Sequence, residues 1–404
     1  MSPSDFSDLL PQQKFLVQTA TLLHQLGAPS HRLERVIGRL ARVIEEPVDV
    51  LYTPTSLLLS FESGSQRTVL KRIEPGDTDL GKLYEVDEAL EYLEDGKASL
   101  AETSARLTAI SQQGERYPLW LILLSAAVVS GCVTVFLGAG IREVLFATLM
   151  GGVIQAWGIW LRRIAPQENL LEVTAGFFCA AIALALSAVI PAFDDRIATL
   201  GSLIILVPGL NFTVAMTELA NRHFSSGVAR LAWAAVVFLA LACGVAMAWR
   251  LGAELRPAEV NSIRLPGWAY FVALFISPFL LAILFQARRS EWSIIVVVAW
   301  AGFISSATAA GWKGSEFGAL VGALVIGLAG NLYARWLDRP ALVATMPGIL
   351  LLVPGSLGYR SLTAFIEQEG LAGLEFAFGT VLIAISIVGG LLVSNLLAPP
   401  RRSL

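Results

Sequence analysis

Polar and ionisable side chains follow a Leu-Val-Pro-Gly tetrapeptide at two places in otherwise apolar stretches of this sequence. The candidates for binding or coupling a substrate are Pro208, Gly209, Asn211, Thr213, Thr217 and Glu218 in the first stretch and Pro354, Gly355, Ser356, Tyr359 and Arg360 in the second. Ionisable groups in apolar segments are costly and commonly mark a substrate or ion pathway. The pattern predicts a transport site for a small molecule.

Glu218 and Arg360 differ in charge, and neither has a charged counterpart in the other stretch, where Ala364 and Val214 stand. This asymmetry suits a substrate that carries both charges, such as an amino acid. Arg360 would pair with the substrate carboxylate or with Glu218, and Glu218 would bind an ammonium group or exchange protons. Alternatively, both side chains lie near the membrane interfaces and extend toward water.

The prolines interrupt the helices that carry these residues. A proline inside a helix removes one backbone hydrogen bond and clashes with the preceding turn, and Gly209 and Gly355 add flexibility. In lipid, freed backbone groups are tolerated where protein or a water-filled cavity surrounds them. The matching breaks favour a cavity, and the alternative is a pair of kinked helices with a packing role only.

The elements that position these residues are predicted to be membrane-spanning helices. The chain has 404 residues, of which 55% are hydrophobic and 15% charged, whereas soluble domains hold about 25% charged residues. This composition excludes an ordinary water-soluble enzyme. Ten apolar segments are long enough, at about 20 residues, to cross a bilayer. They lie near residues 118–137, 142–160, 171–191, 197–219, 228–249, 266–287, 292–310, 316–333, 341–363 and 371–397.

The two tetrapeptides belong to an internal repeat with an offset of 146 residues. The same offset relates Ala198-Thr199 to Ala344-Thr345 and Gly227 to Gly373. Two halves of five spans each follow, at 118–250 and 251–404. Because five is odd, the second half begins on the opposite side of the membrane, so the repeats are predicted to be inverted. Secondary transporters commonly have this design, with substrate bound between the halves.

Residues 1–117 are predicted to form a small α+β domain outside the membrane. They hold 12 Lys and Arg against 18 Asp and Glu, a net charge of −6, whereas residues 118–404 have a net charge of +3. Apolar periodicity predicts helices over 14–26, 31–46, 79–95 and 98–113. Three strands of a meander lie between the second and third helices, which gives the order ααβββαα.

The arginines indicate the orientation. With residues 1–117 in the cytoplasm, the inner connections hold ten arginines, against six Lys and Arg outside. This bias predicts a multi-pass protein of the inner or plasma membrane with both termini cytoplasmic. The N-terminal sequence MSPSDFSDLLPQQ lacks an apolar stretch, so no cleavable signal peptide is expected.

Other chemistry in the N-terminal domain has weaker support. His24, His31 and Glu34 lie at helical spacing, which suits either a metal site or solvated helix residues, and we expect the latter. Ser30 beside His31 is predicted to begin a helix rather than act as a nucleophile. No phosphate-binding loop and no basic stripe occur, so we expect no cofactor, no ATP-driven pump and no nucleic-acid partner.

The sequence resembles the threonine/serine exporter family of bacterial and fungal membrane proteins. Three stretches carry the resemblance: residues 27–34 (GAPSHRLE) with 53–55, residues 206–218 with Ser226-Gly227, and residues 347–361. The family usually has an Asp at the position of Glu218, so this chain keeps an acidic residue there. It usually has an Asn at the position of Val214, where this chain differs. The resemblance implies a ten-helix, proton-driven exporter of small hydroxy amino acids with a cytoplasmic N-terminal domain. Some relatives divide the halves into two chains and are linked to dicarboxylate export.

The expected function is secondary active export of small amino acids, threonine or serine first, with protons and the lipid bilayer as further partners. The alternatives are export of C4-dicarboxylates such as succinate, a channel gated by the N-terminal domain, and a membrane-bound hydrolase that uses the His31 region. The sequence leaves the oligomeric state open, and a homo-oligomer is compatible with it.

Overall fold

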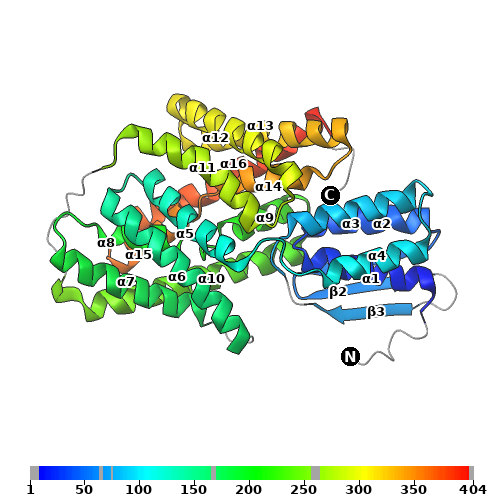
Figure 1. Cartoon of the computed structure of the whole chain (residues 1–404), viewed down its shortest axis with the longest axis horizontal. Helices are drawn as coiled ribbons and strands as arrows, with labels where there is room; N and C mark the ends of the chain where they lie inside the picture. Colours follow the sequence, from blue (N-terminus) through cyan, green and yellow to red (C-terminus); the bar gives the residue numbers. More distant parts are fainter. Residues whose placement is uncertain (1–8, 63–66, 74–75, 165–169, 256–263, 400–404) are drawn as a thin grey trace.

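The computed structural model describes residues 9–62, 67–73, 76–164, 170–255 and 264–399. Its N-terminal part has the predicted order of elements and is called here the N-terminal unit. The elements are α1 (Pro11–Gln25), α2 (Ser30–Val43), β1 (Val48–Thr53), β2 (Ser56–Phe61), β3 (Arg67–Arg72), α3 (Leu80–Glu94) and α4 (Leu100–Gln112). The strands form an antiparallel sheet in the order β1-β2-β3. The helices lie on one side of this sheet (Figure 1).

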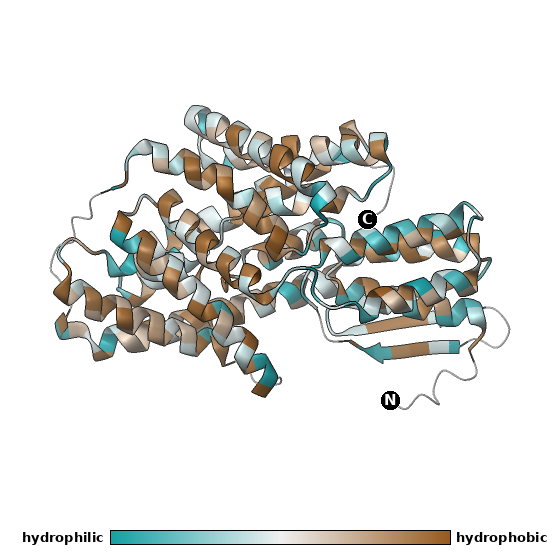
Figure 2. Ribbon diagram, viewed as in Figure 1, coloured by the Kyte–Doolittle hydropathy of each residue, from teal (hydrophilic) through white to brown (hydrophobic). Residues whose placement is uncertain are grey.

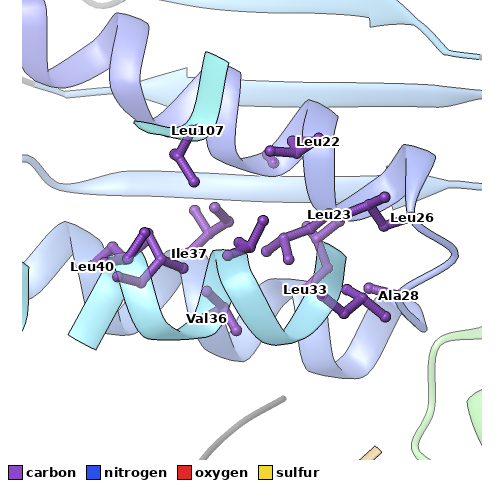
Figure 3. Close-up of a cluster of buried hydrophobic side chains, with 14 of the residues drawn as sticks. Leu22, Leu23, Leu26, Ala28, Leu33, Val36, Ile37, Leu40 and Leu107 are labelled. Atoms are coloured by element: carbon purple, nitrogen blue, oxygen red, sulfur yellow. The ribbon is translucent and has the colours of Figure 1, made fainter. Parts of the chain in front are cut away.

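The core of the N-terminal unit forms where the helices meet the sheet. Leu33, Val36, Ile37 and Leu40 of α2 are fully buried, so the predicted apolar face is confirmed. They pack with α1 and with Leu107 of α4 (Figure 3). The same core continues into membrane helices through a few apolar residues near the unit, which are Ala282, Ala287, Ile295, Leu342, Val343 and Met346. The unit is therefore packed against the membrane part rather than tethered to it.

The remaining elements are predominantly apolar helices (Figure 2). They are α5 (Leu119–Phe136), α6 (Ile141–Ile164), α7 (Leu171–Val189), α8 (Asp195–Leu203), α9 (Gly209–Ala220), α10 (Phe224–Leu251), α11 (Gly267–Leu284), α12 (Trp292–Lys313), α13 (Ser315–Leu337), α14 (Ala341–Leu352), α15 (Gly355–Ile366) and α16 (Gly370–Leu397), with short 3₁₀ turns at Ala253–Leu255 and Arg289–Glu291. Large apolar side chains such as Leu149, Phe271 and Leu396 are 67–82% exposed. Lipid is the solvent that suits such a surface.

Nine stretches of the described chain are long and apolar enough to span a membrane, whereas the sequence predicted ten. The difference lies at residues 197–219. There the chain forms two short helices, α8 and α9, because the backbone leaves the helical conformation before Pro208 and neither piece has the length of a span. Helices α14 and α15 are divided in the same way at Pro354, but together they count as one stretch, Ala341–Ile366.

The two broken helices share one backbone geometry and contact each other. Pro208 has φ −79° and ψ 38°, and Pro354 has φ −80° and ψ 33°. The bounds of α9 and α10 recur 146 residues later in α15 and α16. A Cβ atom added to Gly209 would lie 2.4 Å from Val353 Cγ1 and 3.1 Å from Gly355 Cα. The missing side chains let the breaks cross at van der Waals distance.

We expect Gly209→Ala to destabilise the protein. The new methyl group would overlap Val353 and approach the backbone of Gly355, and overpacking of this kind costs about 1–3 kcal/mol. Gly379→Ala is the matched control, because a Cβ there meets nothing within 4 Å in α16. Thermal unfolding in detergent should show a lower Tm for Gly209→Ala and an unchanged or higher one for Gly379→Ala. Equal Tm values would show that the crossing is loosely packed.

Candidate functional site

A buried carboxylate joins the N-terminal unit to the membrane part. Glu218 of α9 is 0% exposed. It accepts hydrogen bonds from the Ser30 backbone N–H at 3.0 Å and from the Ser30 hydroxyl at 2.5 Å. Arg230 Nε lies 3.1 Å from both carboxylate oxygens. Ser30 is the first residue of α2, whose N-cap Pro29 has no capping side chain, so Glu218 satisfies this helix end from a distant part of the chain.

Tyr52 extends this contact into the N-terminal unit. Its hydroxyl accepts a hydrogen bond from Arg230 Nη2 at 3.3 Å and lies 2.5 Å from His24 Nδ1. Its carbonyl accepts one from Ser226 of α10 at 2.9 Å. Burial, helped by Arg230, lowers the pKa of His24 to about 4, and burial raises the pKa of Tyr52 to about 12. The imidazole is therefore neutral, and its Nδ1 can accept a hydrogen bond from the phenol O–H.

The residues considered for metal binding have different surroundings, and His31 lines the cavity described below. His24 contacts Tyr52, and Glu34 Oε2 lies 2.8 Å from His223 Nε2 in the loop before α10. No group of three or more His, Cys, Asp or Glu in the described ranges could hold a metal ion. The Ser30 hydroxyl donates to Glu218 rather than to a neighbouring histidine.

A second set of bonds attaches the N-terminal unit to the other half of the membrane part. The Leu80 N–H donates to the Phe285 carbonyl at 2.9 Å, at the end of α11. Tyr117, just before α5, donates its hydroxyl to the Ala287 carbonyl at 2.5 Å. Since Glu218 and Arg230 precede residue 251 and these acceptors follow it, the unit bridges the two predicted halves.

A cavity of about 90 Å³, called here the central cavity, lies between α2, α9, α13, α14 and α16. Its lining combines polar and apolar side chains. The polar lining residues are His31, Arg32, Arg35, Thr213, Thr217, Asn221, Asn331, Thr345, Ser394 and Asn395. Asn331 Nδ2 donates to Asn395 Oδ1 at 2.9 Å. Hydroxyl and amide groups of this kind can bind a small polar molecule without a metal or cofactor.

The structure brings only part of the predicted site to this cavity. Thr213 and Thr217 line it. Pro208, Gly209, Pro354 and Gly355 form the helix crossing. Glu218 belongs to the docking contact, and its cation is Arg230 rather than Arg360 as the sequence suggested. Asn211 lies half-buried on α9, outside the cavity lining.

The second predicted cluster lies on α15, away from the central cavity. Tyr359 is 2% exposed and packs in an apolar cluster with Trp249 and Phe193. Its hydroxyl has no hydrogen-bond partner among the described residues. Ser356 and Arg360 are half-buried on the same helix. These residues occupy the positions in the second half that correspond to Leu210, Thr213 and Val214 of the cavity wall.

Comparison with known proteins identifies the family. Two threonine/serine exporter models match the sequence, ThrE over residues 14–252 and ThrE_2 over residues 270–397. The chain belongs to the threonine/serine exporter family. Together the two matched regions of this family take in both the N-terminal unit and the membrane helices.

Relatives of this family member are fungal proteins named pheromone-regulated membrane protein 10. The protein from Eremothecium gossypii is 27% identical over 98% of this chain and 57% of its own length. The protein from Saccharomyces cerevisiae is 26% identical over 98% of this chain and 55% of its own length. The protein from Candida albicans is 29% identical over 88% of this chain and 33% of its own length. The chain thus spans about half the length, or less, of these relatives. No solved structure matches it.

Sequence reasoning missed the residues that join the parts of this family member. Arg230 was counted only for orientation, and Tyr52 only as a strand residue. Arg32 and Arg35 were given no role beyond the polar face of their helix, but they line the central cavity. One signal was available. The segments GAPSHRLE and Thr53-Pro54-Thr55 carry part of the family resemblance, and both lie at or next to residues that contact the membrane part.

We expect Glu218→Ala to loosen the N-terminal unit. The substitution removes the acceptor at the start of α2 and leaves Arg230 buried without its carboxylate, which costs about 3–5 kcal/mol. Hydrogen–deuterium exchange at the first turn of α2 should rise at least about tenfold. Glu254→Ala, which removes an exposed acid, is the control. Unchanged exchange in Glu218→Ala would show that other contacts alone hold the unit.

We expect acid to destabilise the protein through His24. Its pKa is 6.5 when free and about 4 when folded, so the folded state excludes a proton that the unfolded chain binds. The stability present above pH 6.5 is therefore lost as the pH falls from 6.5 toward 4. The Tm of the wild type should decline over this range, and the decline should be smaller in His24→Asn. Parallel Tm–pH curves for the two proteins would contradict this.

Proposed function

We propose that the protein is a secondary active exporter of small amino acids, threonine or serine first, and that the central cavity is its substrate site. The observation that carries the proposal is the composition of the cavity wall. The wall combines α9 from the first half with α13, α14 and α16 from the second, and it presents hydroxyl and amide groups. A polar cavity between two halves is where secondary transporters bind substrate.

The proposed architecture has ten spans in two inverted five-helix repeats, at 118–250 and 251–404, with residues 1–117 as a cytoplasmic domain. The equal geometry at Pro208 and Pro354 supports the repeat, and so do the helix bounds 146 residues apart. In this arrangement α8 and α9 together form the fourth span. The arginine bias supports an inner or plasma membrane location with both termini cytoplasmic.

Glu218 is the proposed coupling residue. Protonation would neutralise the carboxylate and remove its ion pair with Arg230. It would also weaken the bonds to Ser30, because a neutral acid is a poorer acceptor than a carboxylate. A proton at Glu218 would thereby release α2 from α9. Glu218 would link proton binding to access to the cavity, because it would bind the proton and it also holds α2, which lines the cavity.

Counterflow in proteoliposomes tests the carrier proposal. An alternating-access exporter exchanges external labelled serine or threonine for internal unlabelled substrate faster than it performs net transport. A channel gated by the N-terminal unit shows no such acceleration. Acceleration by succinate alone, with none by serine or threonine, would assign the protein to C4-dicarboxylates instead.

We expect Glu218→Gln to abolish proton-driven export. Glutamine keeps the shape of the side chain but carries no titrating group, and exchange of substrate for substrate survives if the role of Glu218 is coupling alone. The measurement is serine efflux driven by an imposed pH gradient, beside serine exchange, with Glu254→Gln as the control. Wild-type efflux with an unchanged pH dependence in Glu218→Gln would refute the coupling role.

A further inference from the structure

The charges around the central cavity are one-sided. All of its basic lining residues, His31, Arg32 and Arg35, come from α2 of the N-terminal unit. The described residues that line it include no aspartate or glutamate. Every other polar group in the wall is a neutral hydroxyl or amide. The membrane helices thus contribute only uncharged groups to the cavity, and α2 of the N-terminal unit contributes its cationic side chains.

This cationic face is held in place. Arg32 and Arg35 are three residues apart, so they project from the same side of α2. On either side of Arg32, Ser30 is bonded to Glu218 and Glu34 to His223. Burial, together with Arg35, lowers the pKa of Arg32 to about 10. Arg32 remains charged at neutral pH.

We propose that Arg32, with Arg35 beside it, binds the carboxylate of the transported molecule, so that the N-terminal unit forms part of the substrate site. This inference rests on the proposed function and narrows its cargo to small carboxylates. A guanidinium group suits this task because its N–H donors match a carboxylate in a bidentate geometry. When α2 leaves the membrane part, the carboxylate loses its partner and is released.

The rest of the cavity offers hydrogen-bonding groups to the other end of such a molecule. Thr213, Thr217 and Thr345 line the cavity, and their hydroxyl groups, which donate to helix carbonyls, can accept hydrogen bonds. Within the described part of the chain His31 Nδ1 is buried without a hydrogen-bond partner, and burial lowers the pKa of this ring to about 3. A neutral imidazole nitrogen can accept a hydrogen bond from an ammonium or hydroxyl group. A hydroxy amino acid and a short dicarboxylate both fit this chemistry.

The test is counterflow by the full chain with L-serine and succinate, and competition by L-serinamide, which has no carboxylate. The variants are Arg32→Gln, Arg32→Lys and the control Arg42→Gln, since Arg42 is exposed on the same helix, donates to the Gly38 carbonyl and does not line the cavity. Loss of a charge-assisted bond should raise the KM of the transported carboxylate about tenfold or more in Arg32→Gln. Arg32→Lys should lie between it and the wild type, and Arg42→Gln should match the wild type. L-serinamide should compete poorly.

A wild-type KM in Arg32→Gln, or competition by L-serinamide equal to that of L-serine, would overturn the inference. A second measurement uses the unmodified protein in case the variant does not fold. Modification of Arg32 by phenylglyoxal, followed by mass spectrometry, should be slowed by L-serine or succinate, whereas modification of Arg42 should not. Absence of protection also overturns the inference. Protection of Arg32 without counterflow would instead disprove the carrier proposal and leave carboxylate binding intact.

Discussion

The arrangement depends on one buried ion pair that is shared between two parts of the chain. Glu218 and Arg230 lie on consecutive membrane-part helices, and both contact the N-terminal unit, through Ser30 and Tyr52. A carboxylate that is fully buried is stable only when cations and donors surround it, so this pair holds α2 at the membrane part. Because α2 forms one wall of the central cavity, the same bonds hold that wall in place.

The second constraint is the crossing of two broken helices. Gly209 and Gly355 allow the chain segments to touch, and the helices that leave the crossing point, α9 and α15, stand in different surroundings. Helix α9 borders the central cavity, whereas Tyr359 of α15 fills the corresponding place in the other half. The two broken helices therefore differ in their surroundings, with a polar cavity beside α9 and packed aromatic residues beside α15.

Local sequence patterns predicted many of the helices and strands. Contacts between residues far apart in the sequence could not be predicted in this way. Leu33, Val36, Ile37 and Leu40 were identified because helical periodicity is written within a few residues. The paired prolines pointed to Thr213 and Thr217 for the same reason. The Ser30–Glu218 bond joins residues 188 positions apart, and nothing in either segment specifies the other. Arg360 was predicted to pair with the substrate carboxylate or with Glu218, from its charge and its place beyond the second break, although Arg230 lies only 12 residues from Glu218.

Substrate protection of a cysteine in the cavity wall tests the central claim most directly. Thr217→Cys, in a chain whose native cysteines are replaced, places a thiol in the lining of the central cavity. We predict that saturating L-serine or succinate slows its reaction with a methanethiosulfonate reagent at least about tenfold. The rate at Thr308→Cys, on an exposed face of α12, should not change. An equal rate at Thr217→Cys with and without either compound would contradict the assignment of the central cavity as the transport site.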